Sequence, residues 1–201
     1  MNKMLTRSLV LFAIAVLPLA ASAITYNAKI NTAQVVNQPA NPLGATGTGT
    51  FVYDANAVTL AYTLQFDSSV ILSMNPAGET INNAITKIHI HTGWPGMTGQ
   101  HVLNVFGLPS EDDLDLNVNF ATNTITGIWG INDIIGDPNV GGSTKVFSDW
   151  VDALRTGNLY VAAHTVNAGG AVELRGQIVP EPASIALLGL GLLAAGARRR
   201  A

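Results

Sequence analysis

The chain of 201 residues contains no cysteine, and only 11% of its residues are charged. Without cysteine, no disulfide can stabilise the fold and no thiolate can act as a nucleophile or a metal ligand. The chain also lacks the pattern G-x-S-x-G, which carries the nucleophile of many serine hydrolases. We therefore predict that the protein is not an enzyme and that it has neither catalytic residues nor residues that bind an organic cofactor.

Basic side chains are scarce outside the two ends of the chain. Five of the ten Lys and Arg residues lie in the terminal segments, at Lys3, Arg7 and Arg198–Arg200. Residues 24–179 keep five basic and twelve acidic residues, which gives this part of the chain a formal net charge of −7. An acidic domain lacks the positive surface that attracts nucleic acids or anionic lipids, so we expect neither as a partner.

The N-terminal segment has the three parts of a secretion signal. Lys3 and Arg7 precede an apolar run from Leu9 to Leu19, and the small residues Ala21 and Ala23 follow at the positions that a signal peptidase recognises. The apolar run is shorter than the roughly 20 residues that a membrane-spanning helix needs. The sequence therefore predicts a signal peptide over residues 1–23, removed by signal peptidase after Ala23.

The C-terminal segment combines a tripeptide, an apolar stretch and a basic end. Pro180, Glu181 and Pro182 precede the stretch Ser184–Ala197, and Arg198–Arg200 follow it. The stretch is marginal for a membrane span, and the arginines would keep that end in the cytoplasm. An uncleaved single-pass anchor is therefore one interpretation of residues 180–201.

The same order of features resembles the PEP-CTERM sorting signal. The resemblance implies a Gram-negative bacterium in which an exosortase cleaves near the tripeptide, after transient insertion of the tail into the inner membrane. The protein would then be released, or displayed on the cell surface, in an exopolysaccharide matrix such as a biofilm.

Residues 24–179 are rich in Thr, Asn, Gly and Val, and short alternating apolar runs recur between turn residues. This pattern predicts an all-β domain, an antiparallel β-sandwich of the immunoglobulin or superoxide dismutase kind, flanked by two hydrophobic signal helices. One short helix is expected, capped by Ser148 or Asp149 and ended by Gly157. The predicted strands are Tyr26–Ile30, Gly47–Tyr53, Val58–Phe66, Ile85–His91, Val102–Phe106, Leu116–Phe120, Thr124–Trp129, Leu159–His164 and Val172–Val179.

Histidines are the main candidates for chemistry in this domain. His89 and His91 lie two residues apart on a predicted strand, so their side chains share one face. His164 ends another predicted strand, and we take His89, His91 and His164 as candidate ligands of copper or zinc, which imidazoles bind well. His101 follows a glycine-rich loop and either approaches His89 and His91 or faces solvent.

A polar face is expected on the last strand, where Glu173 and Arg175 alternate with apolar residues. If the last two strands form a hairpin, His164 lies opposite Glu173. This face is either a metal or anion site, or a hydrogen-bonded polar ladder that fixes the strand register.

Three sequence blocks resemble those of the CHRD domain, a module named from chordin. They are His89–Gly93, Gly157–Thr165 and Glu173–Gln177, and two shorter segments, Ala45–Phe51 and Thr126–Trp129, add support. The turn between the last two blocks departs from the family because it lacks an Asn-Pro pair and is one residue longer. The resemblance implies a β-sandwich and an extracellular binding protein rather than an enzyme.

Three functions are compatible with these features. The first is an exported, non-catalytic binding or structural module. The second is a copper- or zinc-binding protein, because His-x-His followed by a glycine-rich loop and a further histidine is similar to the copper-site segment of Cu/Zn superoxide dismutases. The third is recognition of an anion or glycan at Arg175, with Trp94 or Trp129 as a stacking platform.

Overall fold

The computed structural model describes residues 23–112, 114–133 and 144–181. This part of the chain is mostly β-structure, with one short α-helix and two 3₁₀ turns. The strands are β1 (Ile24–Asn31), β2 (Thr46–Asp54), β3 (Thr59–Phe66), β4 (Ile71–Leu72), β5 (Ala84–Thr92), β6 (His101–Gly107), β7 (Asn117–Asn119), β8 (Thr124–Trp129), β9 (Leu159–Thr165) and β10 (Val172–Pro180). The helical elements are η1 (Thr32–Gln34), η2 (Phe147–Trp150) and α1 (Val151–Arg155).

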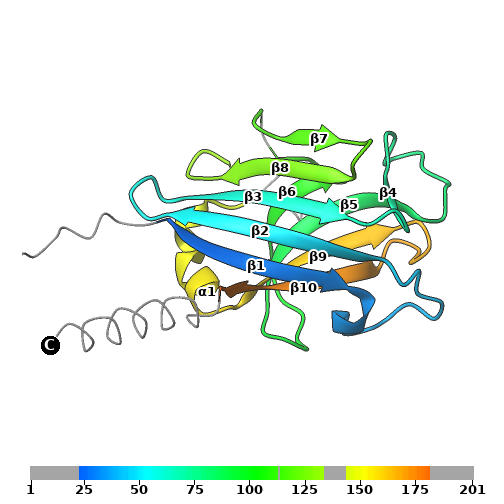
Figure 1. Cartoon of the computed structure of the whole chain (residues 1–201), viewed down its shortest axis with the longest axis horizontal. Coiled ribbons are helices and arrows are strands. Elements are labelled where there is room, and N and C mark those ends of the chain that lie inside the picture. Colours follow the sequence, from blue (N-terminus) through cyan, green and yellow to red (C-terminus); the bar gives the residue numbers. More distant parts are fainter. Residues whose placement is uncertain (1–22, 113, 134–143, 182–201) are drawn as a thin grey trace, which may run out of the picture.

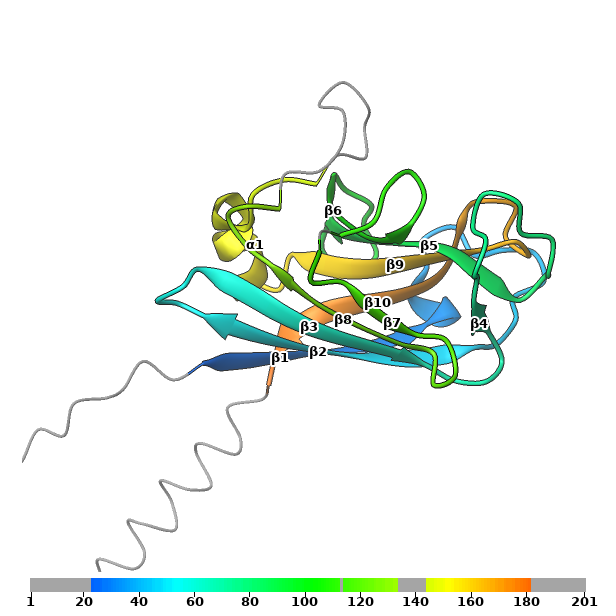
Figure 2. The same cartoon turned by 90° about the horizontal axis from the view of Figure 1, so that it is seen from above.

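The strands form one curled sheet (Figure 1). Its order is β4-β5-β9-β10-β1-β2-β3-β8-β7, and β6 pairs with β5 beside β4. All neighbours are antiparallel except β4 and β5. Figure 2 shows the sheet folding over, so that β5 and β9 lie above β1, β2 and β3. The all-β class is confirmed, whereas a sandwich of two separate sheets is not, because the hydrogen bonding runs continuously through β10 and β1.

The alternation of apolar and polar residues located the strands well. Each of the nine predicted strands corresponds to an observed strand, and only the two-residue β4 was missed. The short helix is confirmed, and Gly157 follows its last turn with a φ of +73°, a conformation that glycine adopts easily. The predicted cap by Ser148 or Asp149 is wrong, because the cap positions are Val146 and Trp150 and neither makes a side-chain cap bond.

The core lies between the two halves of the curled sheet. On β5, Ile88 and Ile90 point into it, and on β9, Val161 and Ala163 do the same. The helical segment closes one end of the core, where the buried Phe147 packs against aromatic rings of β2 and β8, with ring centres 5.8 and 5.0 Å away. Burial of Phe147 therefore accounts for the position of η2 in the absence of a capping side chain.

The predicted signal peptide and most of the sorting tail lie outside the described residues. Only the start of the tail is described: Pro180 is the last residue of β10 and pairs with Tyr26 of β1. The backbone N–H of Glu181 donates to the Thr25 carbonyl at 3.2 Å. Across the described ranges, no helix has the length and apolarity required to cross a bilayer.

We predict that two isoleucines of β8 differ sharply in their effect on stability. Ile125 is fully buried in the core, whereas Ile128 is 43% exposed on the opposite face. Ile125→Ala is expected to lower the free energy of unfolding by about 2–5 kcal/mol, because it leaves a cavity. Ile128→Ala, the matched control, is expected to lower it by less than about 1 kcal/mol. Urea denaturation measures both, and equal losses would contradict the assignment of the core face.

Candidate metal centre

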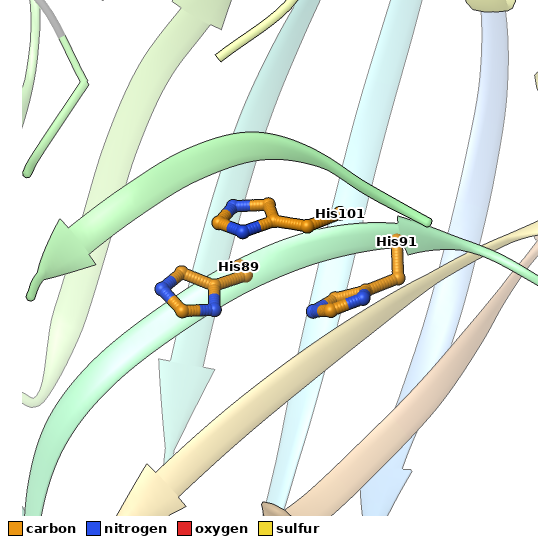
Figure 3. Close-up of side chains that lie close together, drawn as sticks. All are labelled: His89, His91 and His101. Carbon is orange, nitrogen blue, oxygen red and sulfur yellow. The ribbon is translucent and has the colours of Figure 1, made fainter. Parts of the chain in front are cut away.

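All four histidines of the chain lie together on the outer face of the sheet, opposite the core. His89 and His91 come from β5, His101 from the start of β6, and His164 from β9. Figure 3 shows His89, His91 and His101 gathered where β5 and β6 run side by side. These three offer nitrogen atoms within 4.8 Å of one another, and the ring centre of His164 is 5.3 Å from that of His89. We call these four residues the histidine cluster.

Strand pairing explains why residues far apart in the sequence meet here. β5 lies between β6 and β9, and His91 pairs with His101 on one side and with Tyr160 on the other. His164 pairs with Lys87, two residues before His89. The structure therefore groups two of the sequence-predicted ligands, His89 and His91, with His101, whose place was left open. His101's position directly before the predicted strand Val102–Phe106 was the available signal, because a β5–β6 hairpin sets it opposite His91. The third predicted ligand, His164, lies beside His89 but outside the group whose nitrogens are within 4.8 Å of one another.

Backbone carbonyl groups orient three of the rings. The Nε2–H of His89 donates to Leu108 O at 2.8 Å, and the Nδ1–H of His164 donates to Gly170 O at 2.9 Å. The Nδ1–H of His91 donates to Gly99 O at 3.3 Å. A carbonyl oxygen can only accept, so each bond fixes the proton on one nitrogen and leaves the other nitrogen with a free lone pair. Metal-binding histidines in proteins are usually oriented in this way.

Three ring nitrogens of the histidine cluster are buried and lack partners. Nε2 of His91, His101 and His164 each make no hydrogen bond to any described residue. A buried polar atom without a partner costs about 1–3 kcal/mol, and such atoms are uncommon in native proteins. Three of them lie in one cluster, which makes the cluster a candidate site for a ligand that accepts lone pairs.

The environment keeps the imidazoles neutral. Burial lowers the pKa of His89 to about 3, with the nearby His101 as the next cause. Burial, followed by His91, lowers the pKa of His101 to about 4, and burial followed by Lys87 does the same for His164. The pKa of His91 is also lowered, chiefly by burial. Neutral imidazole is the form that binds metal ions, so the cluster is ready for one at neutral pH.

The donor set suits copper or zinc. Imidazole nitrogens are good ligands for both ions, and zinc is commonly held by four ligands at about 2.0–2.1 Å from nitrogen. The nitrogens that His89, His91 and His101 could offer to an ion lie within 4.8 Å of one another. Whether a metal ion binds to His89, His91 and His164 stays a prediction, now with His101 as a fourth ligand.

The predicted polar face exists, but its register differs from the expectation. Val172, not Glu173, lies opposite His164, because the β9–β10 pairing shifts at Glu173. Glu173 and Arg175 are both fully buried, and their hydrogen bonds within the described residues go to groups other than the histidines. Arg175 instead stacks on the ring of Tyr160, with 3.6 Å between the guanidinium carbon and the ring centre. Tyr160 in turn stacks on His91, with ring centres 5.2 Å apart.

The two tryptophans proposed as stacking platforms have different environments. Trp94 is 48% exposed in the loop between β5 and β6. Trp129 is buried in the core, and its indole N–H donates to the Lys145 carbonyl at 2.7 Å. Trp129 therefore cannot present a face to a glycan, and that part of the expectation is wrong.

The depressed pKa values predict a stability that falls on mild acidification. In the unfolded chain the histidines take up protons near pH 6.5, whereas the folded domain resists protonation until about pH 3–4. The unfolded state therefore binds more protons between these values, and the free energy of unfolding of the metal-free protein decreases from pH 6.5 to 4.

His164→Gln removes one titrating ring and is expected to reduce the slope by up to about 1.4 kcal/mol per pH unit. Urea unfolding at pH 7.5, 6.5, 5.5 and 4.5 measures the effect. A constant free energy of unfolding across this range would show that the rings are not buried as neutral groups.

Comparison with protein families accounts for nearly the whole described chain. A family model for the CHRD domain matches residues 26–178, and a model for the PEP-CTERM protein-sorting motif matches residues 179–200. No match was found among curated proteins or solved structures. All four histidines and the Glu173–Gln177 block lie inside the first match, and the basic end lies inside the second. The chain therefore belongs to the CHRD domain family and carries a PEP-CTERM sorting motif directly after the matched domain.

Proposed function

We propose that this exported protein is a non-catalytic metal-binding module, which holds one copper or zinc ion at the histidine cluster. The observation that carries the proposal is the set of three buried Nε2 atoms without partners, on His91, His101 and His164. A divalent ion would accept their lone pairs, together with that of Nδ1 on His89. This proposal combines two of the functions considered from the sequence: a non-catalytic binding module, and copper or zinc as the ligand that it binds.

The enclosure of the cluster favours binding over catalysis. Catalytic zinc sites keep an open coordination position for water or substrate, whereas structural sites are closed by four protein ligands. The candidate ligand atoms of His91, His101 and His164 are inaccessible to solvent, and four imidazoles are present to complete the coordination. A substrate would have to displace a loop before it reached the ion.

Export follows from the sorting motif. A PEP-CTERM motif is recognised by an exosortase and directs a protein to the surface of Gram-negative bacteria. We further propose that signal peptidase removes residues 1–23 and that the domain is released or displayed in an exopolysaccharide matrix. A metal-loaded domain would be stabilised there without disulfides, because binding to the folded state alone adds about 2.7 kcal/mol when the free metal is at 100 times its dissociation constant.

Metal binding is tested directly with the purified protein. After treatment with a chelator, we expect the wild-type chain to take up about one equivalent of Cu²⁺ or Zn²⁺ at pH 7.5, measured by titration and by metal analysis. His101→Ala is expected to weaken binding at least tenfold, because it removes one of four ligands. The rise in melting temperature on metal addition should shrink in parallel.

The chain offers no histidine outside the cluster as a control, so the matched control is the exposed Gln38→Ala. It should bind metal like the wild type. Failure of the wild-type protein to take up either ion at neutral pH would end the proposal.

Processing of the tail is tested in cells that express an exosortase. The mature protein should lack Arg198–Arg200, and Glu181→Ala is expected to leave most of the protein with its tail intact. Mass spectrometry of the exported protein measures both. An intact tail on the mature wild-type surface protein would contradict processing and favour a permanent anchor.

Asn27→Ala is the matched control for this substitution. In the folded domain the Asn27 side-chain amide donates to the Glu181 carboxylate at 3.0 Å. Asn27→Ala removes this contact but leaves the tripeptide unchanged, so the tail should still be cleaved. If both variants kept their tails, the contact between β1 and the tail, not recognition of the tripeptide, would account for the defect.

A further inference from the structure

The two buried charged residues of β10 have a shared role that neither the family nor the proposed metal function assigns. We infer that Glu173 and Arg175 are positioning residues for the histidine cluster, each holding one covering loop whose backbone carbonyl orients one imidazole. That this orientation of the imidazoles serves metal binding rests on the proposed function. The orientation itself can be tested in the metal-free protein.

Arg175 holds the loop of residues 93–100, which connects β5 to β6. Its Nη1 donates to Met97 O at 2.7 Å, and its Nη2 donates to Trp94 O at 2.9 Å. The planar guanidinium can reach both carbonyls at once, which a lysine ammonium on a flexible stem does less well. On the same strand, the Gln177 side-chain amide donates to Gly93 O at 2.8 Å. The loop is thus tied to β10 at three carbonyls.

This loop determines the geometry of two histidines. His91 lies just before it and His101 directly after it, so its conformation sets their separation. The loop also contains Gly99, whose carbonyl accepts the Nδ1–H of His91. Arg175 supports His91 from the other side as well, because it stacks on Tyr160 and Tyr160 stacks on the His91 ring at an interplanar angle of 13°.

Glu173 holds the turn of residues 166–171, which connects β9 to β10. Its Oε2 accepts from Thr165 Oγ1 at 3.2 Å and from Asn167 Nδ2 at 2.9 Å. Its Oε1 accepts the backbone N–H of Leu43 at 2.8 Å. The turn contains Gly170, whose carbonyl accepts the Nδ1–H of His164. Glu173 therefore holds the segment whose carbonyl orients His164, in the same way that Arg175 holds the segment whose carbonyl orients His91.

The burial of these charges supports the assignment. Glu173 is 0% and Arg175 is 2% exposed, and within the described ranges neither forms an ion pair with any charged side chain. Burying a charge is costly unless hydrogen bonds replace its hydration. Here the carbonyls of Trp94 and Met97 accept from the Arg175 guanidinium, and Asn167 of the turn, with Thr165 and the Leu43 N–H, donates to the Glu173 carboxylate. Part of the lost hydration of each charge is therefore replaced by the loop that it holds. In turn, the loop loses this anchor when the charge is removed.

The experiment follows the proton on each imidazole in the metal-free protein. Long-range ¹H–¹⁵N spectra of histidine-labelled protein distinguish the Nδ1–H from the Nε2–H tautomer. In the wild type we expect Nδ1–H at His91 and His164 and Nε2–H at His89. Arg175→Gln is expected to convert His91 to a mixture of tautomers and to leave His164 unchanged, and Glu173→Gln should do the reverse. Affinity for Cu²⁺ is expected to fall about 10–100-fold in each variant.

The exposed Arg155→Gln is the matched control, because Arg155 contacts neither loop over the cluster: it forms a surface ion pair with Asp152 at 3.8 Å and lies over the Tyr53 ring, 5.6 Å from the ring centre. It should leave all four rings and the metal affinity unchanged. If Arg175→Gln does not fold, Arg175→Lys keeps the charge. It should give the same selective tautomer change at His91, but a smaller one.

Equal changes at all four rings in both variants would overturn the inference, because they would indicate general loosening of the fold. Unchanged tautomers with unchanged affinity would overturn it as well. Selective tautomer changes in the two variants, found together with a wild-type protein that binds no metal, would support the positioning role and refute the proposed metal function. The two failures are therefore distinguishable.

Discussion

The need to satisfy four neutral imidazoles, one buried and three partly buried, constrains the outer face of this sheet. Each ring has two nitrogens, and a neutral ring needs an acceptor for one of them and a donor or metal for the other. Carbonyls of three separate segments, at Gly99, Leu108 and Gly170, supply acceptors. The loops that carry these carbonyls must therefore fold over the sheet. Holding them there requires polar side chains, Glu173 and Arg175, that are buried as well.

The curled sheet makes this arrangement possible. Because β5 pairs with β6 on one side and β9 on the other, three strands place histidines on one face while their alternate residues fill the core. β10 lies one strand beyond β9, close enough for Arg175 to reach across Tyr160 to the loop of residues 93–100. The same strand continues to Pro180, so the sorting motif starts at the end of the strand that supports the site.

The sequence predicted the local elements and most of the cluster, but not the long-range relations. Alternation with a period of two located the strands and put His89 and His91 on one face, because that relation depends only on a single strand. The sequence does not reveal strand order, and the position of His101 depends on the β5–β6 register. Glu173 was placed opposite His164 because a simple hairpin was assumed, and the register shift at this residue invalidates that step.

The metal-free domain carries an energetic cost that has to be balanced elsewhere. Three buried nitrogens without partners cost about 1–3 kcal/mol each, a large share of the 5–15 kcal/mol by which domains are usually stable. With no cysteine, disulfides cannot offset this cost. The anchoring of the loops by Glu173 and Arg175 keeps the rings in place before any ion arrives. An ion that coordinates the free nitrogens would remove the cost, and binding would then appear as stability of the whole domain.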